Sequence, residues 1–352
     1  MSASPQEQDG VEDVDGVDVV VPVTLADIAR EAGTSPSTAS RALSGRGYVS
    51  EAARGRLLAV ADRLGYVPNA SARTLKQQRS RVVGVVLSDL DNQFYARLAA
   101  GIEQVLREAN YQMMVLGDNN EPAEEVDGAR MFLAMGAPGV IMTPVGSGAA
   151  ELLRARGTAV VEVDRRLASV PCDAVVIDNE RGGREATMHL AGLGHSRIAL
   201  VGVETDWTSE AGRLEGYRTG LRNARLPLDD DLVVRIAPNA PDAEPRIEAL
   251  IDEQAPTAIF AANNLLAERV WQVLRRRGLR IPHDISLVGF DDVPWMAMVD
   301  PPITVVEQPT LELGRCAAGL LLRRLAGPAL PPVVEILQPR LVVRGSTGPA
   351  RE

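Results

Sequence analysis

One face of a predicted helix carries small hydroxyl groups around a single guanidinium. Four polar residues stand at i, i+3, i+4 and i+7 of this 352-residue chain: Ser37, Ser40, Arg41 and Ser44. Arg can hydrogen-bond guanine with two N–H groups, and Ser can reach bases or phosphates, so this slim ridge fits a major groove. A merely solvated helix face is the alternative reading of the same pattern.

The flanking residues predict a tight helix-turn-helix that would hold this ridge. Thr24 and Asp27 form a capping box at the start of a first helix, and Gly33 ends it. Ser35 can cap the second helix, with Pro36 at its first position, where a missing N–H costs nothing. Ser50 can cap a third helix over 51–64. Apolar residues at helical spacing would fill the core between the three helices: Leu25, Ile28, Ala29, Ala32, Ala39, Ala42, Leu43, Leu57, Ala61 and Leu64.

The charge distribution favours a polyanion as the partner of this region. Residues 24–81 carry ten Lys or Arg against four Asp or Glu, although the whole chain has a formal net charge of −10. A compact positive element on an acidic protein indicates binding to double-stranded DNA, since phosphates repel the rest of the molecule. This charge balance favours the interpretation of the second helix as a DNA-binding helix over its interpretation as a merely solvated helix face.

Length and composition limit the remaining possibilities. A chain of this length fits two or three domains, and its hydrophobic content of 45% excludes wholesale disorder. No apolar run reaches the roughly 20 residues that span a bilayer, and the acidic start lacks a secretory signal. Cys172 and Cys316 lie far apart, so a reducing cytoplasm with two inert thiols is the expected setting. Residues 1–22 are expected to be a disordered acidic tail, the alternative being a DNA mimic that folds back on the head.

Beyond residue 81, short β-branched runs alternate with helix-length amphipathic stretches. Strands are predicted at 82–87, 112–116, 139–142 and 159–163, and the pattern restarts after residue 177 with strands at 197–203, 258–261 and 286–289. Such alternation predicts parallel sheets with right-handed crossovers. Two doubly wound units would leave a cleft at the carboxyl ends of their strands.

Polar residues follow several of these predicted strands and are candidates for that cleft. They are Asp91, Asn92, Asp164, Arg165, Ser209, Arg213, Asn263, Asn264, Asp291 and Asp292. Carboxylate, amide and guanidinium groups together can divide donors and acceptors around a polyhydroxylated ligand. For each acid the alternative is a helix N-cap or a turn residue.

Enzymatic chemistry finds little support in the sequence. No GxGxxG, Walker loop, HExxH or GxSxG motif occurs, and His189, His195 and His283 have no spaced partners for a triad or a metal site. His195 is expected to be a structural loop residue. We therefore expect no catalysis, no cofactor and no metal.

Several linked motifs resemble the lactose-repressor (LacI/GalR) family of transcriptional regulators. They are TLADIAREAG at 24–33, SxxTxSR at 35–41, YVS at 48–50 and LGYVPNASARTL at 64–75. The resemblance continues through the rest of the chain. It implies an all-α helix-turn-helix headpiece and an α/β sensor domain like the periplasmic sugar-binding proteins, made of two doubly wound parallel-sheet subdomains.

The resemblance also implies domain boundaries. After the tail at 1–22, a DNA-binding domain spans 23–67, a hinge helix and linker span 68–81, and an effector-binding domain spans 82–346 before a tail at 347–352. Within the effector-binding domain, the N-subdomain takes about 82–177 and 308–330. The C-subdomain takes about 178–307 and 331–346.

The resemblance assigns roles to residues of the head and hinge. Pro36, Ser37 and Arg41 occupy base-reading positions, although Pro36 donates no hydrogen bond. Phosphate-facing positions fall on Thr24, Ser40, Tyr48, Ser50, Tyr66 and Asn69. Leu75 matches a leucine wedged into the minor groove with its dimer mate, which would bend the operator. Ser35, Thr38 and Ala72 complete the expected DNA-binding set.

In the sensor domain, Asp164, Arg213, Asn263 and Asp291 fall on effector-contact positions of the family. Phe94 and Tyr95 fall on an aromatic lip, and Asp91 and Ser209 complete the expected set. Asn264 replaces a commoner Asp, and 237–241 lack an aromatic that many relatives stack on a ring. Trp207 or Trp295 is the expected substitute for that aromatic. A sugar or polyol is the expected effector; a nucleoside or another metabolite is the alternative.

The expected mechanism is that of a homodimer on a palindromic operator. One head reads too few base pairs for specificity, whereas a two-fold pair multiplies selectivity. We expect the sensor domains to join the dimer through the apolar faces of helices at 94–109 and 311–326. Effector binding would order or melt the hinge helices at 69–75. Repression is the expected outcome, and whether the effector releases or promotes DNA binding stays open. A solute-binding module without a DNA role is the rival function.

Overall fold

The computed structural model describes residues 23–45, 47–66, 80–167, 169–238, 240–327 and 331–351. These residues form two compact units, a small head up to Tyr66 and a larger unit from Ser80 onward. The expected acidic tail and the expected hinge, including Asn69, Ala72 and Leu75, lie outside the described residues.

The head is a three-helix unit built from local signals. Its helices are α1 (Leu25–Glu31), α2 (Pro36–Ser44) and α3 (Glu51–Arg63). Thr24 and Asp27 make the predicted capping box, and the hydroxyl oxygens of Ser35 and Ser50 accept the N–H groups of Thr38 and Ala53. The predicted core residues either belong to the buried cluster of the head or pack against it. The predicted fold of the head is confirmed.

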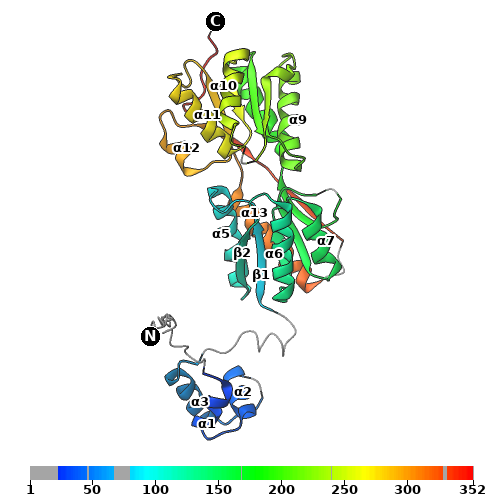
Figure 1. The fold of residues 1–352 in the computed structure, drawn as a ribbon, viewed down its shortest axis with the longest axis vertical. Helices are drawn as coiled ribbons and strands as arrows, with labels where there is room; N and C mark the ends of the chain where they lie inside the picture. Colours follow the sequence, from blue (N-terminus) through cyan, green and yellow to red (C-terminus); the bar gives the residue numbers. More distant parts are fainter. Residues whose placement is uncertain are drawn as a thin grey trace, which may run out of the picture. The chain divides into compact units, whose positions relative to one another are not determined.

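The larger unit has two lobes, each with a six-stranded sheet (Figure 1). The first sheet has the order β11-β5-β4-β3-β1-β2, and all its pairs are parallel. Its lobe consists of β1 (Val82–Leu87), α5 (Gln93–Glu108), β2 (Gln112–Gly117), α6 (Pro122–Ala134), β3 (Gly139–Met142), α7 (Ser147–Ala155), β4 (Ala159–Asp164), β5 (Asp173–Ile177), α13 (Thr310–Ala326) and β11 (Val334–Leu337). In Figure 1, α13 is labelled beside α5, and the two helices pack on each other although they are far apart in the sequence.

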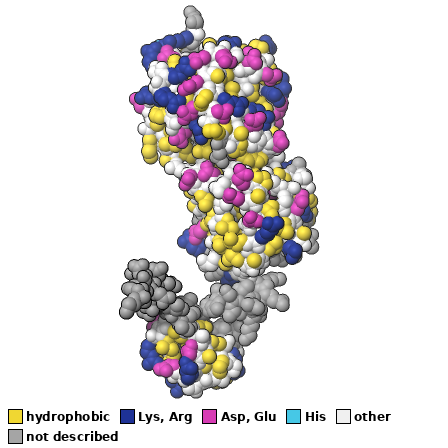
Figure 2. Space-filling view, viewed as in Figure 1, with side chains coloured by type: hydrophobic (Ala, Val, Ile, Leu, Met, Phe, Trp, Pro, Cys, Tyr) yellow, Lys and Arg dark blue, Asp and Glu magenta, His cyan; other side chains and the backbone are white. Residues whose placement is uncertain are grey.

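The second sheet has the order β12-β10-β9-β8-β6-β7, in which only β12 is antiparallel to its neighbour β10. Its lobe consists of α8 (Asn179–Gly192), β6 (Ile198–Val203), α9 (Thr208–Asn223), the short 3-10 helix η1 (Asp230–Leu232), β7 (Val233–Ile236), α10 (Ala243–Gln254), β8 (Ala258–Ala261), α11 (Asn264–Arg276), β9 (Ser286–Phe290), α12 (Pro294–Met298), β10 (Thr304–Glu307) and β12 (Arg340–Val342). Each predicted strand is present in the structure. The sequence did not predict six elements of this lobe, namely η1, β7, α10, α12, β10 and β12. Figure 2 shows cationic and anionic side chains interspersed over this lobe.

Two helices of the first lobe, α5 and α13, approach each other closely at glycine residues. In the first lobe, a Cβ on Gly101 would lie 2.2 Å from the Leu311 carbonyl oxygen, and one on Gly314 would lie 2.3 Å from that of Leu98. Any side chain there would push α5 and α13 apart. Their buried faces are therefore packed inside the lobe. These two apolar faces cover each other and the sheet, and a dimer contact through the two helices stays a prediction.

The chain crosses between the lobes at a different residue from the one expected. We expected 331–346 to belong to the second lobe, but Val334–Leu337 pair with β5 in the first sheet. The chain crosses after Leu337, and Arg340 already pairs with Glu307 in the second sheet. The reason is that β11 adds a parallel edge strand to the first sheet, which a short apolar run cannot reveal by itself.

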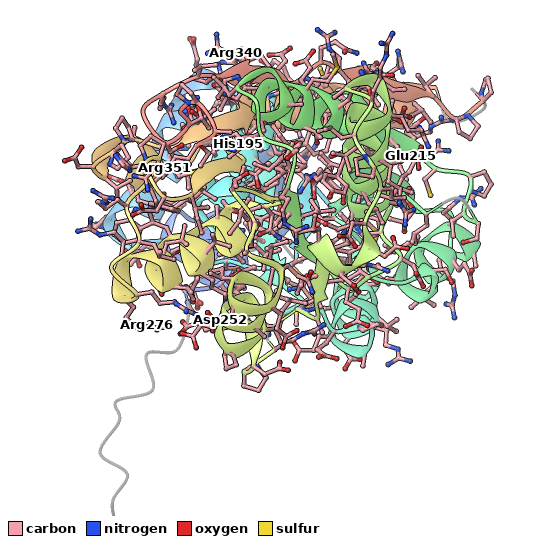
Figure 3. The ribbon with its side chains drawn as sticks, turned by 90° about the horizontal axis from the view of Figure 1, so that it is seen from above. His195, Glu215, Asp252, Arg276, Arg340 and Arg351 are labelled. Atoms are coloured by element: carbon pink, nitrogen blue, oxygen red, sulfur yellow. The ribbon has the colours of Figure 1, made fainter. Side chains whose placement is uncertain are left out.

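The expected tail at 347–352 is also partly incorrect, because its described residues are bound to the second lobe. Ala350 N–H donates to the Leu193 carbonyl, and Gly348 N–H donates to the Ser286 hydroxyl at 3.1 Å. His195, labelled in Figure 3, lies within 3.0 Å of the hydroxyls of Thr257 and Ser286 and of the Gly348 carbonyl. His195 is thus a structural residue, as the sequence indicated. Among the described residues, no helix is long and apolar enough to cross a membrane.

Candidate functional site

The polar ridge on α2 lies on the surface of the head. Pro36, Ser37 and Arg41 are exposed, whereas Ala39 and Ala42 are buried on the other face. Arg41 Nε donates to the Ser37 carbonyl at 3.3 Å, and its aliphatic part passes close to Gly47. Its terminal guanidinium nitrogens make no hydrogen bond with another described residue. They are consequently available to a partner.

The hydroxyl groups at the helix starts already have local partners. Ser35 Oγ lies 2.9 Å from the hydroxyls of both Ser37 and Thr38. The Thr24 hydroxyl donates to the Asp27 carboxylate at 2.6 Å, and these bonds from Thr24 lower the pKa of Asp27. Helix capping is thus the role that the structure shows for these hydroxyls. Tyr48, in contrast, is 90% exposed, Ser40 is half-buried, and Tyr66 is half-buried against the head core.

The arginines of the head fall into two groups. Arg30 and Arg63 form ion pairs with Asp27 and Glu31. Three other arginines in the described part of the head make no ion pair: Arg41, Arg54 and Arg56. Uncompensated guanidinium groups on a small basic domain give a positive surface that suits phosphate.

A cavity of about 380 Å³ lies between the two lobes of the larger unit. Its walls come from the carboxyl ends of strands in both sheets, with β1 and β4 on one side and β6, β7, β8 and β9 on the other. Parallel sheets bind ligands at this edge because strand ends place loops and helix starts there. The lining residues that were predicted from the sequence are Asn92, Phe94, Tyr95, Asp164, Arg165, Ser209, Arg213, Asn263, Asn264 and Asp291.

Two aspartates face the cavity from opposite lobes in the same unusual backbone conformation. Asp164 ends β4 with φ 71°, and Asp291 follows β9 with φ 69°. Left-handed conformations cost energy for residues other than Gly, although Asp tolerates them better than most, and they concentrate at functional sites. Both side chains are buried. Each sheet therefore holds one carboxylate in a fixed direction at the cleft.

Arg213 on α9 lies in the cavity wall with its side chain buried. Nε donates to Asn179 Oδ1 at 2.9 Å, and Nη1 donates to the Ala262 carbonyl at 2.7 Å. The guanidinium carbon lies 3.9 Å from the centre of the Phe290 ring. Nη2 makes no hydrogen bond with another described residue. The arginine is held rigidly and keeps donors for a ligand.

Three buried carboxylates surround this guanidinium. Burial raises the pKa of Asp164, Glu210 and Asp291, while the charge of Arg213 opposes the rise in each. Glu210 pairs with Arg213 at 3.3 Å, and Asp291 Oδ1 accepts the Gln308 amide at 2.6 Å. A ligand that supplies hydroxyl donors would replace the water that these carboxylates have lost.

Arg165 acts mainly in support of the cavity. Nε donates to the Pro144 carbonyl at 2.7 Å, and Nη2 contacts the Ser88 hydroxyl. Its guanidinium carbon lies 3.6 Å from the centre of the Trp207 ring. Trp207 lines the cavity, but this stacking already occupies one of its faces.

Three expectations for the cleft are wrong. Asp91 is exposed and does not line the cavity, because Asn92 takes the N-cap position of α5 and turns inward instead. Asp292 forms an ion pair with Arg344 at 2.6 Å outside the cavity. Trp295 packs with Trp271 against the core of the second lobe and does not line the cavity.

Other lining residues were missed in the sequence. Glu210 stands three residues before Arg213, so its helical spacing could have revealed it. Gln308 follows β10, a strand that was not predicted, and it therefore carried no signal. Four residues on one face of α11 also line the cavity: Leu265, Glu268, Arg269 and Gln272. No group of three or more potential metal ligands occurs among the described residues.

Comparison with known proteins adds two matching family profiles. Residues 24–69 match the family described as bacterial regulatory proteins, lacI family, and residues 187–347 match the periplasmic binding protein-like domain. The HTH-type transcriptional regulator DegA of Bacillus subtilis is 33% identical over 331 residues, which is 93% of this chain and 98% of the relative. The ribose operon repressor of Haemophilus influenzae is 27% identical, covering 92% of this chain and 98% of the relative.

Two solved structures are similar over nearly the whole chain. A complex of the transcriptional regulator CelR with cellobiose has a TM-score of 0.70 at 31% identity, covering 92% of this chain and 99% of that one. The lac repressor dimer bound to operator and the anti-inducer ONPF has a TM-score of 0.79 at 26% identity. It covers 93% of this chain and 100% of the repressor chain.

Proposed function

Because this chain belongs to the LacI family of DNA-binding transcriptional regulators, which are not enzymes, we propose that it represses transcription from a near-palindromic operator. The α2 ridge would enter the major groove, with Arg41 as the principal base reader. Arg54 and Arg56, which form no ion pair in the described head, would meet phosphates. Asn69, Ala72 and Leu75 are proposed to contact the operator, on the family resemblance alone.

We further propose that a sugar or polyol binds in the cavity between the lobes and controls DNA binding. The single observation that supports this is the pair of left-handed aspartates, Asp164 and Asp291, which line the cavity from opposite lobes together with Arg213. A polyhydroxylated ligand donates to carboxylates and accepts from the guanidinium, so it would draw both lobes together. The relatives named above include a ribose operon repressor and a regulator in complex with cellobiose.

The active species is proposed to be a homodimer in the cytoplasm, where the chromosome is accessible. A two-fold protein matches a two-fold operator, and the similar lac repressor is described as a dimer on its operator. Ligand-driven closure of the cavity would alter the spacing of the two chain segments that lead to the heads. Light scattering of the purified protein in solution tests the dimer, and a monomeric mass at micromolar concentration would contradict it.

A gel-shift titration with DNA from upstream of its own gene tests the DNA-binding proposal. Arg41→Ala should weaken specific binding by about 10- to 100-fold, since one bidentate base contact contributes about 1–3 kcal/mol. Arg63→Ala is the matched control, because it removes the same charge from an arginine that is paired with Glu31. Equal weakening by both substitutions would refute a base-reading role for Arg41. Absence of any shift at low salt would favour the rival solute-binding module.

A thermal-shift screen with sugars tests the effector proposal, since a ligand that binds only the folded state raises the melting temperature. Arg213→Gln should abolish the rise that an active sugar produces. Arg222→Ala, at an exposed position of the same helix, should keep it. A rise that survives Arg213→Gln would place the ligand elsewhere.

A further inference from the structure

The cavity continues well beyond the group of charged residues at its centre. Asn263 and Asn264 line it at the start of α11, and Leu265, Glu268, Arg269 and Gln272 follow at i, i+3, i+4 and i+7. This spacing places all four side chains on one helix face. At 1.5 Å per residue, the lined face extends about 12 Å from Asn264 to Gln272. The cavity is therefore an elongated groove rather than a round pocket.

Among the described residues, small side chains predominate in the cavity wall that follows β7. Ala237, Pro238, Ala240 and Ala243 line the cavity between β7 and the first turn of α10. These four side chains are short, and Glu244 is a longer side chain that lines the cavity beside them. Pro238 and Leu265 offer apolar surface on the two walls, and Leu265 is 41% exposed. Apolar contacts of this kind suit the C–H faces of a second ring.

The polar groups of the groove are balanced in charge. Glu244 pairs with Arg276 at 2.6 Å, and Glu268 accepts the Gln272 amide at 3.1 Å. Figure 3 labels Arg276 at the rim of the molecule. Arg269 is half-buried and makes no hydrogen bond or ion pair with another described residue. One acid and one unpaired guanidinium, Glu268 and Arg269, thus face the groove beside an amide.

The centre of the cavity holds three carboxyl groups against two guanidinium groups. Asp164, Glu210 and Asp291 face Arg165 and Arg213, and each of the three acids is buried. A phosphate or a carboxylate would therefore be repelled at the centre, and in the groove Arg269 would attract it only against the adjacent charge of Glu268. Neutral hydroxyl groups fit both regions, because they can donate to the acids and accept from the arginines.

On these grounds we infer that the effector is an uncharged disaccharide, or the end of a longer oligosaccharide, with one ring at the Asp164–Arg213–Asp291 centre and the next along α11. The inference rests on the proposed function, because it concerns the same effector cavity. The second ring would hydrogen-bond Glu268, Arg269 and Gln272 and pack on Pro238 and Leu265. Length along α11 thus selects the effector.

Titration calorimetry on the full-length protein tests this with matched sugars. The probes are glucose with cellobiose and maltose, galactose with lactose and melibiose, and xylose with xylobiose. At least one disaccharide should bind ten or more times tighter than either of its component monosaccharides. The double variant E268A/Q272A should weaken that disaccharide at least tenfold and change the monosaccharide affinity by less than twofold.

Arg269→Ala provides a second, independent variant with the same expected pattern. Arg275→Ala is the control, since Arg275 is exposed on α11 and does not line the cavity. A monosaccharide that binds as tightly as the best disaccharide would overturn the inference and leave the effector site standing. Equal loss of both sugars in E268A/Q272A would do the same. If no sugar in the panel binds, the carbohydrate proposal itself falls together with this inference.

Discussion

Replacing Glu162 by Gln should stabilise the protein at alkaline pH and do so much less at acid pH. Glu162 lies on β4 and is only 1% exposed. Its Oε2 accepts the Leu167 N–H at 3.1 Å, whereas Oε1 has no hydrogen-bond partner. Burial raises the pKa of Glu162 from 4.5 to about 7, because the charged form loses its water, although Leu167 N–H and Arg166 oppose the rise.

The magnitude follows from proton linkage. An acid whose pKa is higher in the folded state binds more protons when folded, so stability falls as pH rises through the window from 4.5 to about 7. The folded state is penalised by roughly 3 kcal/mol at pH 8 and by roughly 1.5 kcal/mol at pH 5.5. Gln keeps the acceptor for Leu167 and never ionises. The gain from Glu162→Gln should therefore be about 2 kcal/mol larger at pH 8 than at pH 5.5.

Urea denaturation followed by circular dichroism at the two pH values measures this difference. Glu151→Gln is the control, because Glu151 is an exposed residue of α7 in the same lobe. The same substitution there should give no pH-dependent gain. Equal effects of Glu162→Gln at both pH values, or a loss of stability at pH 8, would refute the argument from burial.

Four further predictions concern other parts of the molecule. Leu57→Ala should lower the free energy of unfolding of the head by about 2–5 kcal/mol and abolish the gel shift. The sugar-induced rise in melting temperature should persist, and loss of that rise as well would contradict the prediction. Gly216→Ala should lower the melting temperature sharply, since its Cβ would lie 2.2 Å from the Glu180 carbonyl, whereas Gly192→Ala has open space and should not. Glu125→Gln should destabilise the protein at pH 8, as measured by urea denaturation. Both carboxylate oxygens of Glu125 accept backbone N–H groups, and the amide nitrogen of Gln would face one of these donors. A gain in stability like that expected for Glu162→Gln would contradict this prediction. Burial lowers the pKa of His195, so the stability of the protein should fall as pH drops below 6.5. His195→Asn should reduce this dependence of the melting temperature on pH, and an unchanged dependence would contradict the prediction.

These predictions separate two kinds of interaction in the protein. The head depends on short-range caps and a few apolar contacts, which individual substitutions can remove. The sensor unit depends on close helix approaches and on carboxylates that are buried between elements distant in sequence. Charge therefore affects the two units differently, through exposed arginines in the head and through desolvation in the sensor unit.

The sequence by itself determined what local chemistry controls. Thr24, Ser35 and Ser50 cap helices a few residues away, so their roles could be predicted without any distant partner. The alternation of strands and helices likewise predicted parallel sheets, and strand ends pointed to Asp164, Arg213 and Asp291. These features depend on hydrogen bonds and periodicity within a few residues.

The tertiary structure alone decided which neighbours turn inward and which distant groups meet. Asn92 rather than Asp91 lines the cavity, since one residue of helix register reverses a side chain. Asp164 and Asp291 approach the same guanidinium only because the carboxyl ends of two separate sheets face each other. The position of β11 and the partners of Gln308 depend on packing between remote segments, and such long-range contacts leave no periodic trace in the sequence.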